Sequence, residues 1–224
     1  MALSGPHLSP KSGKATALVV LLHGYGSDGN DLISLAEPLS QLLPGAAFVA
    51  PNAPVPCPGA GFMWFPIAEL DPHVMHKGVA ATAPSLLTFI ESELQRLALG
   101  ADRLALIGFS QGTMLALHLG LSHLKPAAVV GFSGVLTGEG PNKVPEQLPP
   151  YFLAHGTADE VIPPDALFVT ARTLGAIGAR VQWHLSAGIG HGIDDNALAL
   201  AGNFLRLAFD GRLSAAGPAS QLWR

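Results

Sequence analysis

The five-residue segment around Ser110 indicates that this serine could act as a nucleophile. The segment GFSQG, residues 108–112, puts this serine between two glycines, after an apolar run and before a helical pattern. A strand, a serine and a helix in that order form a nucleophile elbow, and the glycines leave room for a strained serine. The helix start would direct N–H groups and the positive end of its dipole toward the site. A second interpretation stays open, in which Ser110 is only the N-cap of that helix.

A serine hydroxyl is a weak nucleophile, so Ser110 needs a histidine base and a carboxylate that orients the base. In α/β-hydrolases the acid and then the histidine follow the serine along the chain. Four later histidines fall in or beside helical or strand-like segments: His118, His123, His155 and His184. His191 instead lies in the glycine-rich loop AGIGHGID, and catalytic side chains are common on loops after strands. We predict that His191 is the base, with a plain loop histidine as the alternative, and that His155 and His184 are core or edge histidines.

The acid should lie between Ser110 and His191, again just after a strand. Asp159 meets this condition in the segment YFLAHGTADEVIPP, where prolines close the loop after an apolar run. Glu160 is adjacent, and a place at the start of the next helix explains Asp165. We therefore predict that Asp159 is the orienting acid.

The same chemistry requires two N–H donors for the negative charge that develops on the substrate oxygen. One would be the backbone N–H of Gln111, directly after Ser110. The segment LLHGYGSDGNDL, residues 21–32, would supply the second from the backbone of Tyr25, because a loop after an earlier strand contributes it in such sites. The alternative is a turn of glycine and aspartate without a role in catalysis, and His23 is structural in either case.

Bulky apolar residues near the site suggest where a substrate would bind. Residues 55–67 contain four in a row, which we predict to form a wall beside the acyl group: Phe62, Met63, Trp64 and Phe65. Met114 and Ile162 are further candidates for this lining. The opposing interpretation is a loop that packs its aromatic side chains into the core.

Two other motifs are weaker candidates for function. Ser133 in GFSG also follows a strand-like run, but it lacks the second glycine of the elbow motif and is interpreted as a turn residue. His73 and His76 have a spacing that could suit zinc, yet no third ligand is evident nearby, and solvated histidines at a helix start are the preferred interpretation. We expect neither a metal nor an organic cofactor.

An alternation of strands and helices positions these residues. Apolar runs of strand length are predicted at 15–24, 46–54, 103–109, 127–134, 150–157 and 180–188. Helical patterns are predicted at 77–98, 111–122, 164–177 and 195–209, with Pro84 shifting the start of the first or kinking it. This alternation predicts an α/β fold with a mostly parallel, twisted sheet and helices on both faces.

The composition favours one folded domain. The chain has 224 residues, of which 49% are hydrophobic and 12% charged, as in packed globular proteins. We predict a single domain over 1–224, with its core at 15–210 and a loose tail at 211–224. The net charge of −4 argues against a nucleic acid partner.

The remaining sequence features concern location and assembly. Cys57 is the only cysteine, so the fold cannot depend on an internal disulfide. The first residues lack the apolar core of a signal peptide, and no run is long enough to span a membrane, so we predict a cytoplasmic protein. Trp223 and the apolar balance hint at a homodimer.

The motifs together resemble the phospholipase/carboxylesterase family of α/β-hydrolases, which includes acyl-protein thioesterases and small bacterial carboxylesterases. The resemblance covers about residues 15–210 and rests on LLHGYGSDGNDL, FVAPNAP, MWFP, GFSQG, GFSG, HGTADEVIP and GHGI, in family order. It implies an α/β-hydrolase fold with a triad of Ser110, Asp159 and His191. It also implies an oxyanion hole made by the N–H groups of Tyr25 and Gln111.

The resemblance implies hydrolysis of carboxylic esters with short to medium acyl chains, through an acyl-enzyme, with a small ester or acyl compound as substrate. Thioesterase members commonly carry Trp-Phe-Asp where this chain has Trp64-Phe65-Pro66, and the HGYGSDGNDL loop is more like the bacterial carboxylesterase branch. Acyl-protein thioesterase or lysophospholipase activity is the nearest alternative. A non-catalytic binding module on the same fold is a third possibility.

Overall fold

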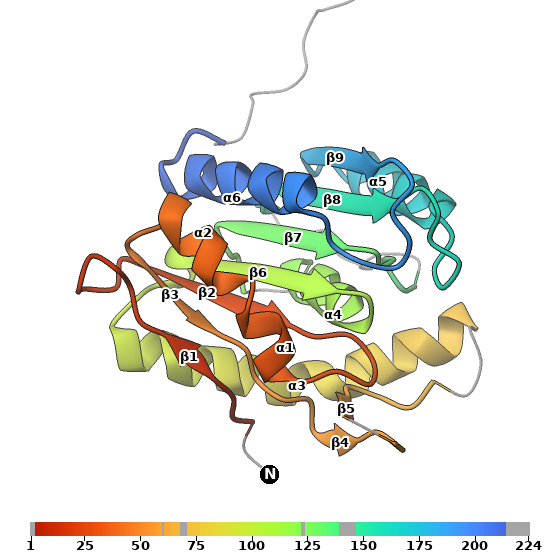
Figure 1. Cartoon of the computed structure of the whole chain (residues 1–224), viewed down its shortest axis with the longest axis horizontal. Helices are drawn as coiled ribbons and strands as arrows, with labels where there is room; N and C mark the ends of the chain where they lie inside the picture. The colour runs from red at the N-terminus through yellow and green to blue at the C-terminus, as the bar shows by residue number, and fades with distance from the viewer. Residues whose placement is uncertain (1–2, 60, 68–70, 122–123, 139–146, 214–224) are drawn as a thin grey trace, which may run out of the picture.

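A seven-stranded sheet forms the centre of the structure, a computed structural model that describes residues 3–59, 61–67, 71–121, 124–138 and 147–213 (Figure 1). Its strands are β1 (His7–Leu8), β2 (Ala17–Leu22), β3 (Ala46–Val49), β6 (Leu104–Phe109), β7 (Ala128–Phe132), β8 (Tyr151–Gly156) and β9 (Val181–Ser186). They lie in the order β1-β3-β2-β6-β7-β8-β9, and every neighbouring pair is parallel except β1 with β3. The predicted mostly parallel sheet is confirmed.

Helices cover both faces of this sheet, as predicted. They are α1 (Gly29–Ile33), α2 (Ala36–Leu42), α3 (Pro72–Leu97), α4 (Gln111–Gly120), α5 (Asp165–Ala176) and α6 (Asp195–Phe209). Helices α3, α4 and α5 pack on one face, and α1, α2 and α6 pack on the other. Figure 1 shows α3 below the sheet and α6 along its opposite side.

Strand β2 shows why its apolar run is unbroken. Successive side chains of a strand point to opposite faces of the sheet. Leu18 and Val20 accordingly pack into the cluster beneath α3 and α4, whereas Val19 and Leu21 pack into the cluster beneath α2 and α6. Because both faces are buried, no position of the strand is left for a polar residue.

The structure corrects several predicted boundaries. Helix α3 begins at Pro72 rather than at residue 77, because the Asp71 carboxylate accepts hydrogen bonds from the N–H groups of His73 and Val74 and caps the helix there. The helix continues through Pro84 to Leu97. The strand predicted at 46–54 ends at Val49. Most of the tail predicted at 211–224 lies outside the described residues.

Six short elements were missed by the sequence analysis. Strand β1 has two residues, and the hairpin of β4 (Val55–Pro56) with β5 (Phe62–Met63) has two in each strand. Helices α1 and α2 are also short, and a single 3₁₀ turn, Ala101–Arg103, precedes β6. Segments of this length are too short to display a period.

The strand order reverses between β2 and β6, because β3 lies on one side of β2 and β6 on the other. The carboxyl ends of parallel strands at such a reversal form a crevice in which ligands bind. Tyr25 follows β2 and Ser110 follows β6, so these two residues flank the reversal. The topology therefore points to the same place as the elbow motif.

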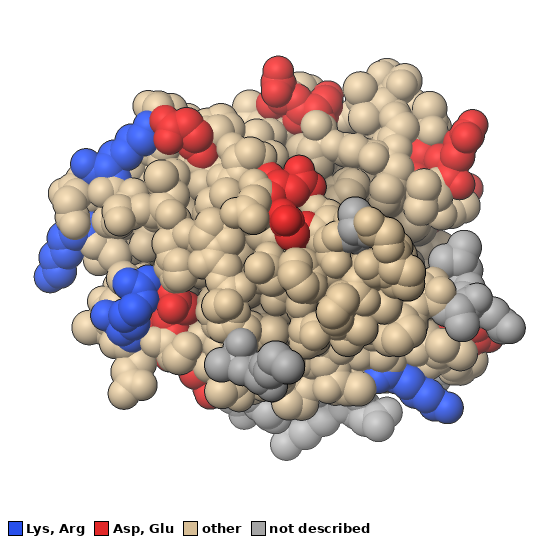
Figure 2. Space-filling view, turned by 60° about the horizontal axis from the view of Figure 1, so that its bottom comes forward, with Lys and Arg blue, Asp and Glu red and all other residues tan. Residues whose placement is uncertain are grey.

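Two further features concern the surface. On the face drawn in Figure 2, basic side chains gather mainly toward one end, and acidic side chains occur in small separate groups. In the part of the chain that the structure describes, no helix is both long and apolar enough to cross a membrane.

Candidate active site

Ser110 has a strained backbone at the junction of β6 and α4. Its φ of 52° and ψ of −114° lie in a region that residues with a side chain rarely adopt. The turn is held because the Ser110 N–H donates to the Phe132 carbonyl on β7 at 2.9 Å. The Ser110 side chain makes no capping hydrogen bond to α4, so the interpretation of this serine as a side-chain N-cap is wrong.

The two glycines of the motif allow the turn to be this tight. A side chain at Gly108 would overlap the backbone of Gly112, and one at Gly112 would overlap the Leu22 carbonyl on β2. The first turn of α4 therefore lies directly against the ends of two strands. The two glycines therefore permit close helix–strand packing as well as the strained conformation predicted for the serine.

Asp159 and His191 form a buried acid–base pair on two loops that follow β8 and β9. The His191 Nδ1–H donates to the Asp159 carboxylate at 2.8 Å. The Asp159 side chain is 0% exposed and that of His191 is 19% exposed, so the acid is shielded while the imidazole reaches the surface. This hydrogen bond leaves His191 Nε2 as the ring's proton acceptor.

The Asp159 carboxylate collects several N–H groups. One oxygen accepts hydrogen bonds from the N–H groups of Val161 and Ile162, each at 2.9 Å. The other oxygen, which binds His191, also lies 3.1 Å from Nε2 of the buried His155. Burial alone would raise the pKa of Asp159, but the hydrogen bonds from His191 and the two backbone groups outweigh it and hold this pKa below its ordinary value of 3.8. Asp159 is therefore an ionised carboxylate near neutral pH.

Packing brings the serine turn and the histidine loop together. The His191 ring lies 4.9 Å, between ring centroids, from the ring of Phe109, the residue before Ser110. Ser133, on the next turn, donates to the Gly192 carbonyl at 3.4 Å. In this structure the Ser110 hydroxyl and His191 Nε2 are not hydrogen-bonded to each other. Hydrogen bonds of this kind often form fully only with substrate.

Ser133 is a second strained serine, at the end of β7. Its φ is 46°, and its N–H donates to the Ala154 carbonyl at 2.9 Å, which repeats the arrangement of Ser110 one strand further along. Its side chain is nearly fully buried and holds the loop of His191. The turn predicted at this residue is confirmed.

The two predicted oxyanion donors, on the loop after β2 and at the start of α4, lie on segments that contact each other. A side chain placed on Gly24 would come within 3.3 Å of the Ser110 Cβ, so the loop that carries Tyr25 runs beside the serine. Among the described residues, the backbone N–H groups of Tyr25 and Gln111 have no hydrogen-bond acceptor. Two unpaired donors beside a serine are what a developing oxyanion requires.

The side chains of Tyr25 and His23, both between β2 and α1, have other roles. The Tyr25 ring is 45% exposed, and a hydrogen bond with the Cys57 thiol raises the pKa of its hydroxyl. His23 is fully buried, accepts at Nε2 from the Ala53 N–H at 3.0 Å, and donates from Nδ1 to the Gly24 carbonyl at 2.8 Å. Burial lowers the pKa of His23, which keeps the ring neutral. The prediction that His23 is structural is confirmed.

The Gln111 side chain also makes specific contacts, which the sequence analysis did not anticipate. It is fully buried, accepts from the Trp64 N–H at 2.8 Å and donates to the Phe65 carbonyl at 2.8 Å. The sequence predicts a functional role only for the backbone N–H of this residue. A glutamine next to a nucleophile gives no signal in the sequence for partners 46 and 47 residues away.

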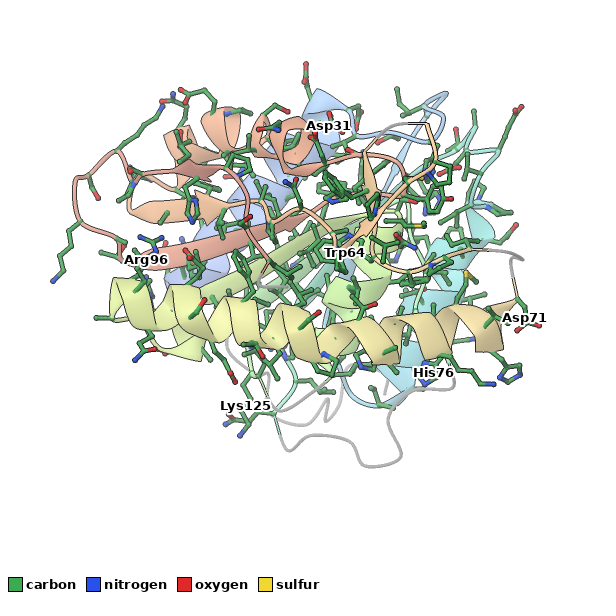
Figure 3. All side chains as sticks on the ribbon, turned by 90° about the horizontal axis from the view of Figure 1, so that it is seen from below. Asp31, Trp64, Asp71, His76, Arg96 and Lys125 are labelled. Atoms are coloured by element: carbon green, nitrogen blue, oxygen red, sulfur yellow. The ribbon has the colours of Figure 1, made fainter. Side chains whose placement is uncertain are left out.

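The predicted acyl-side wall lies mostly in the core. Trp64 is 1% exposed, donates from Nε1 to the His23 carbonyl at 2.9 Å, and lies among the side chains alongside α3 (Figure 3). Phe65 and Met63 are also buried, and Phe62 is half-buried. For Trp64 and Phe65 the structure supports the alternative of aromatic packing in the core. Met114 and Ile162, the two further candidates, are buried in the same cluster.

A small cavity lies beside Phe109. Its volume is about 210 Å³, and its lining comprises Asp31, Leu32, Ser34, Leu35, Phe109 and Ile193. Phe109 and Ile193 neighbour the serine and the histidine along the chain, so this cavity adjoins the candidate site. Sequence reasoning missed it because α1 was not predicted.

Two histidines that were set aside, His155 and His184, take the core and edge positions predicted for them, and His123 lies outside the described residues. His155 is buried in β8 and its Nε2 contacts the Ile162 carbonyl at 2.8 Å, and His184 lies on the edge strand β9 beside Asn196. His76, on α3, contacts the Thr137 carbonyl at 3.2 Å (Figure 3), and His73 is exposed. In the described ranges, no three histidine, cysteine or acidic side chains are grouped so that they could hold a metal ion.

Comparison with known proteins identifies the family to which the chain belongs. Residues 4–209 match the family described as phospholipase/carboxylesterase. The chain belongs to this family. The resemblance predicted from the short motifs is confirmed, and the match extends beyond the predicted stretch toward the N-terminus, where β1 lies.

Three known proteins illustrate which enzymes and structures this chain is similar to. A protein whose crystal structure is described as esterase PE8 is 39% identical, with a TM-score of 0.84 over 92% of this chain and 99% of that one. Acyl-protein thioesterase 1 of Yarrowia lipolytica is 32% identical over 168 residues, 68% of this chain and 74% of the relative. The Bacillus cereus carboxylesterase, 19% identical with a TM-score of 0.75 over 92% and 94%, shares the fold. The chain is thus a hydrolase of the carboxylesterase and acyl-protein thioesterase type on an α/β-hydrolase fold.

Proposed function

We propose that this protein is a serine esterase that hydrolyses small carboxylic esters through an acyl-enzyme on Ser110. The observation that carries the proposal is the strained turn at Ser110, with its side chain free of any capping bond, beside the hydrogen-bonded pair of His191 and Asp159. These three residues have the chain order and the strand ends that a Ser-Asp-His triad requires.

The proposed reaction begins when His191 Nε2 takes the proton of the Ser110 hydroxyl as its oxygen attacks the ester carbonyl. Asp159 holds the His191 ring in the Nδ1–H tautomer and stabilises the imidazolium that forms. The free N–H groups of Gln111 and Tyr25 bind the oxyanion. His191 then protonates the leaving alcohol, and a water molecule activated by the same ring releases the acid from Ser110.

We propose a preference for short acyl or alcohol groups. Trp64 and Phe65, which could have extended an apolar wall, are enclosed in the core. Their burial removes that wall and favours a group of a few carbons over a long fatty acyl chain.

A fluorophosphonate probe tests the nucleophile, because it reacts covalently with an activated serine. We expect labelling of the wild-type protein and of Ser133→Ala, and none of Ser110→Ala. Ser133 is a matched control because it also follows a strand in a strained conformation. Equal labelling of wild type and Ser110→Ala would overturn the assignment.

A second candidate is cleavage of thioesters or lysophospholipids. It is favoured by the name of the curated relatives, acyl-protein thioesterase 1, of which that from Aspergillus fumigatus is 28% identical over 94% of this chain and 97% of its own length. A panel of p-nitrophenyl esters from two to sixteen carbons, an acyl thioester and a lysophospholipid separates the candidates. We expect kcat/KM to be highest for the esters of two to four carbons, and failure to cleave any of these compounds would favour a binding role instead.

The predictions of a single domain over 1–224, of a cytoplasmic location and of a homodimer are retained as proposals. Size-exclusion chromatography with light scattering would test the homodimer, because a mass of one chain at all concentrations contradicts it.

A further inference from the structure

The Gln111 carboxamide links the serine turn to a distant backbone segment. Its Oε1 accepts from the Trp64 N–H and its Nε2 donates to the Phe65 carbonyl, both at 2.8 Å. The side chain is 0% exposed, so water does not compete for either bond. A planar amide that pairs with two backbone groups of adjacent residues allows little rotation at the first residue of α4.

The same segment also holds the loop that carries Tyr25. The Gly26 N–H donates to the Phe62 carbonyl at 2.9 Å, and the Phe62 N–H donates to the Ser27 carbonyl at 2.7 Å. Trp64 adds its indole N–H, which donates to the carbonyl of His23 at 2.9 Å. Residues 62–65 are therefore hydrogen-bonded both to the loop of Tyr25 and to the first residue of α4, which supply the two oxyanion donors.

We propose that the Gln111 side chain is a positioning residue, which fixes the N–H groups of Gln111 and Tyr25 relative to each other through residues 62–65. This inference rests on the proposed function and concerns the geometry of its oxyanion hole. Gln111 would thus act in two ways, through its backbone as a donor and through its carboxamide as the anchor of that donor.

The arrangement matters most when the oxyanion forms. The neutral carbonyl oxygen of the bound ester gains less from hydrogen bonds than the charged oxygen of the tetrahedral intermediate. Misplaced donors therefore destabilise the transition state more than the ground state. Removal of one such donor slows kcat by about 100- to 1,000-fold in other hydrolases. A donor that is displaced rather than removed should give a smaller loss.

Gln111→Met tests the inference, since it keeps the volume of the side chain and removes both of its hydrogen bonds. With p-nitrophenyl acetate we expect kcat to fall by about 10- to 100-fold while KM changes less than about threefold. The inhibition constant of an alkyl trifluoromethyl ketone, which forms a tetrahedral adduct with the serine, should rise by a similar factor. Gln111→Asn, which keeps the amide but shortens its reach, should show the same split and serves if Gln111→Met does not fold.

Thr82→Val is the matched control. The Thr82 hydroxyl, on α3, donates to the Trp64 carbonyl at 2.9 Å and is also buried, so this variant removes one buried hydrogen bond of the segment but leaves its hydrogen bonds to Gln111 and to the Tyr25 loop in place. We expect a lower melting temperature in both variants but kcat within about threefold of wild type in Thr82→Val. The inference is overturned if the Gln111 variants keep a wild-type kcat and inhibition constant, or if Thr82→Val loses kcat equally.

The outcome can be separated from that of the proposed function. If the wild-type protein is not labelled by the fluorophosphonate, the proposed function fails. If it is labelled and the Gln111 variants behave like Thr82→Val, only the positioning role fails.

Discussion

Asp159→Asn is the substitution for which the structure gives the sharpest expectation. The carboxylate accepts from His191 Nδ1 through one oxygen and from two backbone N–H groups through the other. Asparagine has one acceptor oxygen and one NH₂ group. The backbone groups of Val161 and Ile162 would keep the oxygen, and the NH₂ would face the imidazole.

The consequence follows from the ring tautomer. An NH₂ group facing Nδ1 can only donate, so the ring of His191 would have to accept at Nδ1 and carry its proton on Nε2. A protonated Nε2 cannot take the proton of Ser110. Where a triad acid has been changed in this way, kcat falls by about 10⁴, equivalent to about 5.4 kcal/mol of transition-state stabilisation.

Hydrolysis of p-nitrophenyl acetate measured from pH 6 to pH 9 checks this expectation. We expect Asp159→Asn to lose about 10⁴ in kcat with KM within a few-fold, and circular dichroism to show a folded protein. Glu160→Gln is the matched control because it removes the adjacent, exposed carboxylate, and its kcat should stay within about twofold of wild type. Retention of more than a tenth of the wild-type kcat by Asp159→Asn would refute the assignment of Asp159 as the orienting acid.

Three further outcomes are expected. Gly112→Ala should lower the free energy of unfolding by about 2 kcal/mol or more in urea titrations, because its methyl group would overlap the Leu22 carbonyl; an unchanged midpoint contradicts this packing. The lowered pKa of Asp159 means that the ionised carboxylate stabilises the folded state above about pH 3.8 and that this stabilisation is lost as the pH falls through the lowered value. The stability advantage of wild type over Asp159→Asn should therefore shrink in acid melts below pH 3.8, and a constant difference would count against it. Asp194→Ala should lower the free energy of unfolding by about 1 kcal/mol, because this carboxylate caps α6 through the Ala197 N–H, and no change would show that the cap is dispensable.

The strained turn at Ser110 shows how much of the site a local pattern contains. The apolar pattern of a strand, two glycines and the apolar pattern of a helix follow one another within a few residues. Each of these reflects the backbone geometry that is needed at its own position. The predicted order of serine, acid and histidine relies on the same kind of signal at three strand ends. The position of His191 against Asp159 was therefore predictable once the sheet was inferred to be parallel.

Other parts of the fold carried no such signal. Strand β1 and the hairpin of β4 and β5 have two residues per strand and exist because a neighbouring strand or turn supplies their hydrogen bonds. Residues 62–65 are bulky and apolar, a composition that suits either a substrate wall or a core segment. Only their packing against α3 and β2 shows that Trp64 and Phe65 are buried.

The amino-acid sequence by itself determined the alternation of strands and helices, the serine elbow and the choice of Asp159 and His191, because these depend on residue type and spacing within short segments. The tertiary structure alone decided the second contact of Asp159 with His155, the cavity beside Phe109 and the pairing of the Gln111 side chain with Trp64 and Phe65. Those features depend on the orientation of side chains from several elements packed together. A hydrogen bond between residues far apart in the chain leaves no periodic trace in either segment.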